Sequence, residues 1–549
     1  MPVVGYFTAE IGLWSELRTY SGGLGVLAGD HVKSAADAKI PLVGVTLLYH
    51  QGYAQQHIDE MGIQTETFPE HDPNKHLSKT GIVLRLTLDE RTLFAYVWKA
   101  EIQGVHGNSV PVYFLDTRHP KNSPEHQALS SRLYGGDDAV RIRQEYVLGV
   151  GGVQLFDHLN VELSGLHLNE GHCTFAMLEL LHRGWSREEL ARRSLFTTHT
   201  PVPAGHDRFD WSLVKSVIGD LLPDDAKSLV RNAGDSEKGA RCSMSHLAVA
   251  LSTSVNAVSK LNADVAMTMF DEQVIQPITN GVHHITWTSP VMASFFDKHL
   301  NGWRFQPESI GNAYHLPTEE LLEARSESRK QLRDYVRSTT GVELSADRLT
   351  IGFARRFATY KRANLVFKNL ERLQAIGGGK IQFVFSGKAH PRDQGGKQLI
   401  RDIFESANQI ADTIPVAFIE NYDMHTGLMM TSGVDIWLNN PIRPMEASGT
   451  SGMKAAMNGV PNCSILDGWW PEACIHGVNG WAIGNAEENR DDDRDAENIY
   501  NVLENEVIPL WEQEGDAWSD VMKASIAASA GFTGQRMIQD YLEFYNQFS

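Results

Sequence analysis

The chain has 549 residues, and 49 Lys+Arg against 68 Asp+Glu give it a formal net charge of −19. The length predicts two to four domains, and 42% hydrophobic residues are enough for large cores and argue against disorder. The acidic balance argues against sequence-independent nucleic-acid binding, and four cysteines without a CxxC pair argue against a disulfide scaffold or structural zinc.

The first residues, MPVVGYFTAEIGLWSE, lack the basic and apolar regions of a secretory signal. The sequence also lacks an uninterrupted apolar run of the roughly 18–20 residues that a bilayer requires. We therefore expect a soluble, cytoplasmic protein without a membrane span.

In the first half of the chain, short apolar runs alternate with helical patterns. The predicted strands are Val3–Phe7, Leu42–Leu48, Val112–Leu115, Leu163–Leu168 and Ser194–Thr198. The predicted helices are Gly25–Ala38, Ala139–Asp157, Gly171–Arg183 and His246–Leu261.

The second half repeats this rhythm after a charged helix near Thr318–Arg337. The predicted strands are Leu349–Ala354, Ile381–Ser386, Ile414–Ile419, Val434–Leu438 and Asn462–Leu466. The predicted helices are Arg362–Ala375, Gly396–Asn408, Met424–Thr431 and Ile499–Glu512.

This alternation predicts an α/β protein with parallel sheets, because strands of this length separated by helices are typical of that class. Two α/β halves of similar size suggest two nucleotide-binding-like domains with a cleft between them. Open α/β sheets bind ligands at the carboxyl ends of their strands, so we expect the functional residues there.

Two segments have features that suit an anion. Tyr20–Gly25 (YSGGLG) precedes a helix, so its backbone amides could approach a phosphate, although such a turn is equally common as a purely structural one. Phe353–Arg362 (FARRFATYKR) places the cations Arg355, Arg356, Lys361 and Arg362 after a predicted strand. Arginine suits phosphate, and the alternative is a basic surface turn that pairs with nearby acids.

A third segment, Asn440–Ala456, crowds small residues into a turn before a helix that carries Lys454. A lysine in a first helical turn is normally exposed. Here Ala455, Ala456 and Met457 indicate burial, which lowers the pKa of a lysine and suits Schiff-base chemistry.

Polar loop residues follow several apolar runs, in LNEGH, TTHTP, ITNGVHH and ENYD. Many short polar groups suit the hydroxyls of a carbohydrate. The histidines His172, His283 and His284 could instead ligate a metal, but no HExxH-type spacing is present. We therefore predict no metal site and interpret these histidines as structural.

Several of these segments together resemble the α-glucan (glycogen/maltodextrin) phosphorylase family. They are YSGGLGVLAGD, LNEGH, THTPVPAGHDRF, TNGVH, FARRFATYKR, FSGKAHP, IENYDM and EASGTSGMKAAMNG, in the order of that family, from about residue 4 to residue 484. The last is the most specific, because it resembles the family's pyridoxal-phosphate lysine segment.

The resemblance implies a glycosyltransferase-B type fold, in which two Rossmann-like domains face each other across the active site. We expect a glucan- and phosphate-binding domain at 1–285, a pyridoxal-phosphate-binding domain at 286–530, and a C-terminal helix at 531–549 that could cross back to the first domain. The chain resembles the short bacterial-type form of the family, without the regulatory segment or extra domain that precedes this region in other members. Its regulation is therefore left open.

The resemblance also implies an activity: reversible phosphorolysis of a terminal α-1,4-linked glucose to α-glucose 1-phosphate, with retention of configuration. The expected cofactor is pyridoxal 5'-phosphate, held as a Schiff base, whose phosphate works beside the substrate phosphate. The expected partners are inorganic phosphate, glucose 1-phosphate and α-1,4-glucan, without nucleic acid or membrane. A homodimer is possible, and the oligomeric state stays open.

Matching the family's motifs assigns the expected site residues. The catalytic residues are Lys361, Arg356, Glu446 and His199, the last with the weakest match. The cofactor-binding residues are Lys454, Thr450, Gly449, Tyr422 and Arg355, of which Arg355 replaces a family lysine. The substrate-binding residues are Gly23, Asn280, Ser448, Gly449 and Glu446.

The chain also departs from better-known members at several further positions. Thr253 stands where they carry a histidine near the glucose 6-hydroxyl, Asn262 replaces another histidine, and Ala257 replaces a glycine. Ala358 begins ATYK where they read His-Glu-Tyr-Lys.

Two other interpretations stay open at this stage. One is a cofactor-free sugar-nucleotide glycosyltransferase of the same fold, which would have no reason to bury Lys454. The other is a non-catalytic glucan-binding relative, for which Thr253 is the main support.

Overall fold

The computed structural model describes residues 3–202, 205–234, 240–271, 273–486, 490–513 and 515–548. The chain divides into two compact units. Unit 1 comprises Met1–Tyr53, Phe68–Asn280 and Gly534–Ser549, and unit 2 comprises Ala54–Thr67 and Gly281–Thr533.

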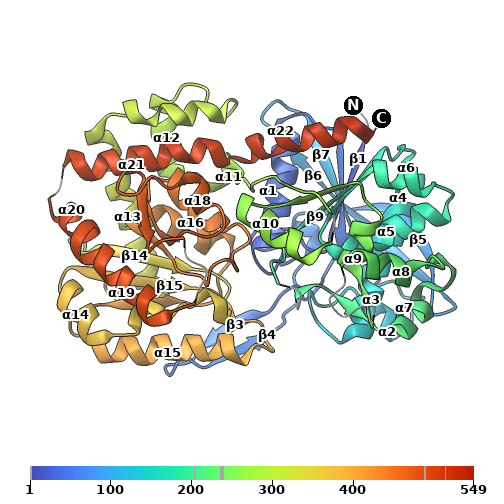
Figure 1. The fold of residues 1–549 in the computed structure, drawn as a ribbon, viewed down its shortest axis with the longest axis horizontal. Helices are drawn as coiled ribbons and strands as arrows, with labels where there is room; N and C mark the ends of the chain where they lie inside the picture. The colour runs from blue at the N-terminus through green and yellow to red at the C-terminus, as the bar shows by residue number, and fades with distance from the viewer. Residues whose placement is uncertain are drawn as a thin grey trace. The chain divides into compact units, whose positions relative to one another are not determined.

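Unit 1 is built on a nine-stranded sheet with the order β13-β12-β9-β8-β1-β2-β7-β6-β5 (Figure 1). Its strands are β1 Val4–Thr8, β2 Leu42–Leu47, β5 Ser78–Leu88, β6 Arg91–Gln103, β7 Ser109–Asp116, β8 Gly165–Asn169, β9 Ser194–Thr198, β12 Ser254–Ala257 and β13 Ile275–Pro277. The strands from β13 to β7 pair in parallel, whereas β6 runs antiparallel to both β7 and β5. A separate antiparallel pair is formed by β10 Arg208–Phe209 and β11 Cys242–Ser243.

The helices of unit 1 cover this sheet and close two cores. They are α1 Gly23–Asp37, α2 Pro124–Ala128, α3 Asp138–Tyr146, α4 Gly152–Leu159, α5 Phe175–His182, α6 Arg187–Arg192, α7 Trp211–Ile218, α8 Ala226–Asn232, α9 Met244–Ala250, α10 Lys260–Met269 and α22 Gly534–Tyr545. Tyr6 and Phe7 are adjacent in β1 but belong to different buried clusters. Because adjacent strand residues point to opposite faces, the sheet is buried on both faces.

Unit 2 contains a six-stranded, wholly parallel sheet with the order β16-β15-β14-β17-β18-β19. Its strands are β14 Leu349–Ala354, β15 Ile381–Ser386, β16 Val416–Ile419, β17 Ile436–Asn439, β18 Asn462–Ile465 and β19 Gly480–Ile483. Its helices are α11 His284–Trp287, α12 Pro290–His299, α13 Thr318–Thr340, α14 Leu370–Gly377, α15 Gln394–Ile410, α16 Met424–Gly433, α17 Thr450–Met457, α18 Trp470–Ala473, α19 Asp492–Val502, α20 Ile508–Glu512 and α21 Asp516–Ser529.

A hairpin of β3 Gln55–Ile58 and β4 Gln64–Thr67 also belongs to unit 2. The side chain of Gln56 donates to the carbonyl of Gly387 at 2.9 Å, and its backbone amide donates to Asn421 at 3.2 Å. The hairpin is therefore held by the loops that follow β15 and β16.

The structure confirms the α/β class with parallel sheets, but several of its elements differ from the sequence-based prediction. The predicted helix His246–Leu261 is wrong, because α9 ends at Ala250 and strand β12 intervenes before α10. Ser259 caps α10 by accepting from the amide of Asn262, so the helical pattern begins a second time there.

The predicted helix Arg362–Ala375 begins later, at Leu370. Arg362 has a φ of 50°, and its guanidinium is tied to two acids and two carbonyls. Asn369 caps the real helix through the amide of Arg372. The antiparallel strands β5 and β6 were not predicted from the sequence, although buried and more exposed residues alternate along much of both strands.

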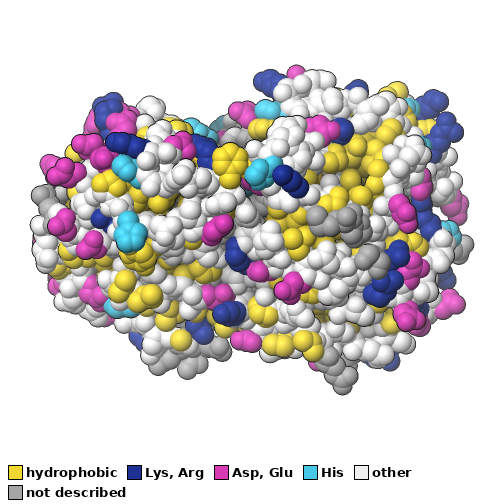
Figure 2. Space-filling view, turned by 90° about the horizontal axis from the view of Figure 1, so that it is seen from above, with side chains coloured by type: hydrophobic (Ala, Val, Ile, Leu, Met, Phe, Trp, Pro, Cys, Tyr) yellow, Lys and Arg dark blue, Asp and Glu magenta, His cyan; other side chains and the backbone are white. Residues whose placement is uncertain are grey.

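Within the part of the chain that the structure describes, we find no helix with the length and apolar content to cross a membrane. On the face shown in Figure 2, acidic and basic side chains are interspersed rather than gathered by sign.

The close approach of α1 to the segment after β1 yields a testable prediction. A Cβ at Gly29 would lie 2.0 Å from the carbonyl oxygen of Gly12. Gly29→Ala should therefore push α1 away and lower the stability of unit 1 by about 1–3 kcal/mol. Calorimetric Tm measurement should show this loss, whereas Gly531→Ala, where a Cβ meets no atom within 4 Å, should leave Tm unchanged. Equal Tm values for the two variants would contradict the packing described.

Candidate functional site

The predicted site residues of unit 2 gather where the strand order of its sheet reverses. From β14 the chain continues to β15 and β16 on one side, and β17 lies on the other side of β14. Such a reversal leaves a crevice at the carboxyl ends of the two central strands. Arg355 to Lys361 follow β14, and the segment 440–449 follows β17, so both lie at the carboxyl ends of these two strands.

A buried carboxylate joins two cations at this edge. Glu446 Oε2 lies 2.8 Å from a guanidinium nitrogen of Arg355 and 2.6 Å from Nζ of Lys361. All three side chains are less than a tenth exposed. Burial alone would raise the pKa of Glu446, yet the charges of Arg355 and Lys361 bring that pKa down to about 2. Glu446 is therefore ionised at neutral pH.

A second carboxyl group lies behind Glu446. Asp467 accepts from the backbone amides of Glu446 at 2.9 Å and Gly468 at 2.8 Å. Burial, together with the charge of Glu446, raises the pKa of Asp467 to about 7. Asp467 thus fixes the backbone that carries Glu446, although no sequence signal pointed to it.

The four cations of the predicted anion segment have different environments. Arg355 also donates to Asn439 at the end of β17. Arg356 is exposed. Arg362 is buried and pairs with Asp492 and Asp495, which fits the alternative of a basic turn that pairs with acids.

Lys454 lies in the last turn of α17 and is only 5% exposed. Its Nζ lies 3.6 Å from the ring centroid of Trp287, which is the last residue of α11 and is 1% exposed. The burial that the neighbouring small residues predicted is therefore confirmed. Trp287 was missed, because it stands three residues beyond the segment ITNGVHH that the sequence pointed to.

The turn before α17 presents backbone and hydroxyl groups. Gly449 occupies the N-cap position with a φ of 84° and, as a glycine, brings no side chain to cap the helix. Ser448 is buried, and its Oγ has no hydrogen-bond partner among the described residues. Thr450 begins α17. The start of α17 can therefore offer amides and hydroxyls to an anion.

Tyr422 precedes α16, and burial raises the pKa of its hydroxyl, which the nearby Asp423 raises further and Arg355 lowers. The influence of Arg355 places Tyr422 near the cations that follow β14. The Tyr422 hydroxyl is therefore neutral at pH 7.

In unit 1 the strand order also reverses, between β1 and β8. After β1, Glu10 accepts from the amide of Ser21 at 2.6 Å and from the hydroxyl of Tyr134 at 2.7 Å. This buried carboxylate pins the glycine-rich turn, and Gly23 begins α1 beside it with an exposed backbone.

His199 follows β9 and is anchored through its backbone. Its amide donates to Glu170 Oε2 at 2.8 Å, and Glu170 itself has a strained φ of 75°. Burial lowers the pKa of His199 to about 4, despite the opposing charge of Glu170, so the ring is neutral at pH 7. Its Nε2 is buried without a hydrogen-bond partner among the described residues.

Asn280 is the last residue of unit 1 before the main segment of unit 2, Gly281–Thr533. It is 4% exposed, its amide donates to the carbonyl of Val258 at 3.0 Å, and its Oδ1 has no hydrogen-bond partner among the described residues. The structure therefore places Gly23, His199 and Asn280 in unit 1, and the other predicted site residues in unit 2.

The expectation that Thr253 replaces a sugar-binding histidine is not supported by its position. Thr253 is exposed, donates to the carbonyl of Ala191 at 2.8 Å and precedes β12 at its amino-terminal end. His199 follows the parallel neighbour β9 at the carboxyl end, so a strand length of roughly 15 Å separates the two. Ala358 is half-buried in the loop between β14 and Lys361.

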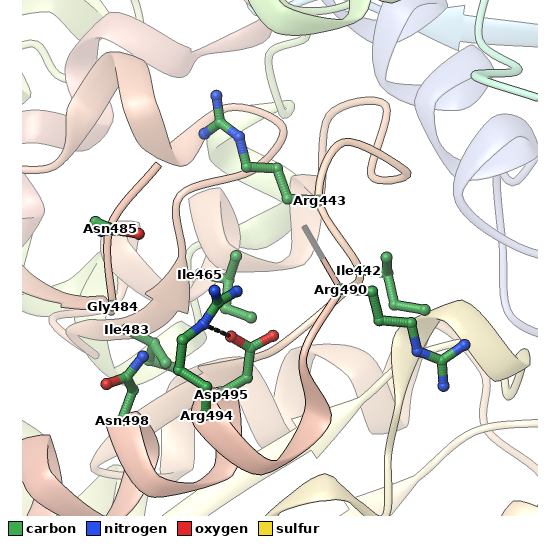
Figure 3. Close-up of a pocket in the computed structure, with 10 residues that line it drawn as sticks. All are labelled: Ile442, Arg443, Ile465, Ile483, Gly484, Asn485, Arg490, Arg494, Asp495 and Asn498. Carbon is green, nitrogen blue, oxygen red and sulfur yellow. Dashed lines mark ion pairs between the residues drawn. The ribbon is translucent and has the colours of Figure 1, made fainter. Parts of the chain in front are cut away.

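A small pocket of unit 2 lies beside the last residues of β18 and β19 (Figure 3). Three arginines line it, but Arg443 and Arg490 point away from each other, and Arg494 turns toward Asp495. The arginines do not converge, so this pocket is not arranged for an anion.

The sequence is similar to that of known carbohydrate phosphorylases. The family model described as carbohydrate phosphorylase matches residues 208–473. The maltodextrin phosphorylase of Thermococcus litoralis is 38% identical, over 100% of this chain and 70% of that protein. The glycogen phosphorylases of Aquifex aeolicus and Mycobacterium tuberculosis are 36% and 34% identical, over 100% and 99% of this chain and 86% and 70% of those proteins.

The pairing of Glu446 with two buried cations predicts a pH-dependent loss of stability. Glu446→Gln leaves Arg355 and Lys361 without their counter-charge and should cost about 3–5 kcal/mol at pH 7. Because the native pKa of about 2 lies below the ordinary value near 4.3, this contribution is present above about pH 4.5. It is lost as the pH falls toward 2.

The free energies of unfolding of wild type and Glu446→Gln in urea should therefore differ equally at pH 7 and pH 5, and should differ less at pH 3. Glu405→Gln, at an exposed position of α15, is the matched control and should stay within about 0.5 kcal/mol of wild type. A gap that is small at pH 7, or that widens in acid, would overturn this account of the ion pairs.

Proposed function

We propose that this chain, which belongs to the carbohydrate phosphorylase family, catalyses the reversible phosphorolysis of α-1,4-glucan. A terminal glucose would leave as α-glucose 1-phosphate, with its configuration retained. The single observation that carries the proposal is the buried Lys454 on Trp287, in the same unit as the carboxyl-edge cations Arg355 and Lys361.

The cations would serve the phosphate. A phosphate dianion in a partly water-excluded site needs compensating charge, which is worth more there than in water. Arg356 and Lys361 would bind the substrate phosphate, with a further backbone donor from Gly23. Glu446 supports this role, because its carboxylate holds the buried Lys361 side chain at a defined position.

The residues present also fit pyridoxal 5'-phosphate. Lys454 would hold its aldehyde carbon, with the ring of Trp287 covering the amine from one side. Gly449, Thr450 and Arg355 would take the cofactor phosphate at the start of α17, and Tyr422 would pack nearby. When bound, that phosphate group would supply charge and proton exchange beside the substrate phosphate.

The glucose would be held by short polar groups. Glu446, Ser448 and Gly449 would bond hydroxyls from unit 2, and His199 and Asn280 would do so from unit 1. The unpartnered, buried polar atoms of Ser448, His199 and Asn280 support this assignment, because buried polar atoms normally find partners.

For the architecture, we infer a glycosyltransferase-B arrangement of two Rossmann-like domains with the active site in the cleft between them. The domain roles predicted for 1–285 and 286–530, and the helix at 531–549 that returns to the first domain, belong to this proposal. A cytoplasmic location and a homodimer also belong to this proposal. Analytical ultracentrifugation of the purified chain would decide whether it is a dimer.

The direct test is whether the purified chain releases glucose 1-phosphate from maltooligosaccharides only when inorganic phosphate is present. Proton NMR of the early product should show the α anomer. Glucose transfer from a sugar nucleotide without added phosphate would instead favour the cofactor-free glycosyltransferase. Glucan binding without turnover would favour the non-catalytic relative.

The cofactor assignment predicts a covalent mark. Borohydride reduction of the chain purified with pyridoxal phosphate, followed by peptide mapping, should place the pyridoxyl group on Lys454. Lys523→Ala removes another buried lysine of unit 2 and should keep the label, whereas Lys454→Ala should lose it. A colourless, unlabelled chain that is fully active would contradict the assignment of pyridoxal phosphate to Lys454.

The phosphate assignment predicts a kinetic effect at an exposed arginine. Arg356→Ala should raise the KM for phosphate and lower kcat by roughly 10²–10³-fold, the cost of removing one preorganised donor. Steady-state rates at varied phosphate give both values. Arg337→Ala, on the exposed part of α13, is the control and should behave as wild type. Unchanged phosphate dependence in Arg356→Ala would remove Arg356 from the site.

A further inference from the structure

The last helix of the chain, α22, is part of unit 1 although the main body of unit 2 precedes it in sequence (Figure 1). Its buried residues Met537, Ile538, Tyr541, Phe544 and Tyr545 recur at helical spacing and belong to the core cluster that includes α1. Apolar packing therefore fixes where α22 lies, and its polar side chains act from a defined position.

Arg536, in the first turn of α22, reaches two consecutive backbone carbonyls. One guanidinium nitrogen donates to the carbonyl of Thr279 at 2.5 Å and to that of Asn280 at 3.1 Å. The other terminal nitrogen pairs with Asp540, one turn later, at 2.6 Å. The ion pair orients the planar guanidinium, so its donors face the 279–280 backbone.

The same backbone is held from its other side by the sheet. The amide of Ile278 donates to the carbonyl of Ala257 at 2.9 Å, and the amide of Asn280 donates to that of Val258 at 3.0 Å. The amides are thus tied to the end of β12 and the carbonyls to α22. With its backbone fixed on both sides, the buried side chain of Asn280 has little freedom of direction.

A second set of contacts ties α22 to the strands that carry the other unit 1 residues. The Tyr545 hydroxyl lies 2.9 Å from His31 Nε2 and 2.6 Å from His167 Nδ1, and His167 Nε2 lies 2.8 Å from Thr197 Oγ1. Thr197 donates to Asn256 Oδ1 at 2.6 Å, so it must accept from His167.

This donor count fixes the direction of the whole chain of hydrogen bonds. His167 Nδ1 accepts from the Tyr545 hydroxyl, whose oxygen accepts from His31. Burial lowers the pKa of His31 to about 3 and that of His167 well below its ordinary value, so both rings are neutral. The hydrogen bonds that tie α22 to His31 and His167 therefore do not change with pH near neutrality. Through His167 they extend to Thr197, two residues before His199.

We propose that Arg536 is a positioning residue for the sugar substrate, which holds the Thr279–Asn280 backbone so that the Asn280 side chain meets a glucose hydroxyl. This inference rests on the proposed function, because it takes Asn280 as a glucose-binding residue. Arg536 itself touches no substrate, and its effect passes through the backbone of Asn280. The simpler alternative is that Arg536 only stabilises the start of α22.

The full-length protein with Arg536→Ala, Arg536→Lys and Gln539→Ala separates these roles. Gln539 is exposed on the same helix and serves as the matched control. Hydrogen exchange of a peptide covering 275–282 reports on the amides of Ile278 and Asn280. Initial rates at varied maltooligosaccharide report on substrate binding, and Tm reports on general stability.

We expect Arg536→Ala to speed exchange in 275–282 and to lower kcat/KM for maltooligosaccharide by about 10–100-fold, the range for a misplaced binding group. The loss should fall mainly on KM for the glucan, with KM for phosphate unchanged. Arg536→Lys keeps one donor and should recover part of both effects, whereas Gln539→Ala should match wild type.

An active wild type with Arg536→Ala equal to Gln539→Ala in kcat/KM overturns the inference alone. A Tm loss in Arg536→Ala with unchanged exchange at 275–282 also overturns it, since that is the behaviour of a helix stabiliser. A wild type that releases no glucose 1-phosphate in phosphate overturns the proposed function, and with it the substrate role given to Asn280.

Discussion

The unit 2 site depends on one electrostatic constraint, the placement of Arg355 and Lys361 below the surface. Two buried cations at one sheet edge would repel each other and lose hydration, so the fold must supply an anion. Glu446 supplies it through a single oxygen that both cations contact. Asp467 then fixes the Glu446 backbone, so the position of the cations follows from that of the carboxylate.

The sheet topology explains how residues about 85 positions apart in sequence meet. β14 and β17 are neighbours, but the chain visits β15 and β16 before it returns to β17. Their carboxyl ends share the crevice that this reversal creates. Arg355 and Lys361 follow β14, whereas Glu446 follows β17. Helix α17 begins four residues after Glu446, so Lys454 is close to Glu446 in sequence and belongs to the same unit.

Much of this could be predicted from local patterns, and the rest depended on contacts between distant segments. The runs before Arg355 and Asn440 indicated buried parallel strands, and the small residues around Lys454 indicated its burial. The partners of Arg362 were not predictable, because Asp492 and Asp495 stand some 130 positions away. A motif match gives no strand position, so it could not show that Thr253 and His199 stand at opposite ends of neighbouring strands.

The two units differ in the kind of group they offer, and this difference bears on the proposed chemistry. The unit 1 side chains assigned to substrate, His199 and Asn280, are uncharged, and the nearby acids Glu10 and Glu170 are occupied by backbone amides. Unit 2 holds its cations at the edge beside Glu446. Neutral hydrogen-bonding groups suit sugar hydroxyls, whose recognition needs geometry rather than charge, and cations suit phosphate.

The proposed reaction transfers a glucosyl group from a glucan to phosphate, so it needs both kinds of group. The separation also allows the neutral groups of unit 1 to be positioned by uncharged contacts such as those of Tyr545, without disturbing the charge balance of unit 2.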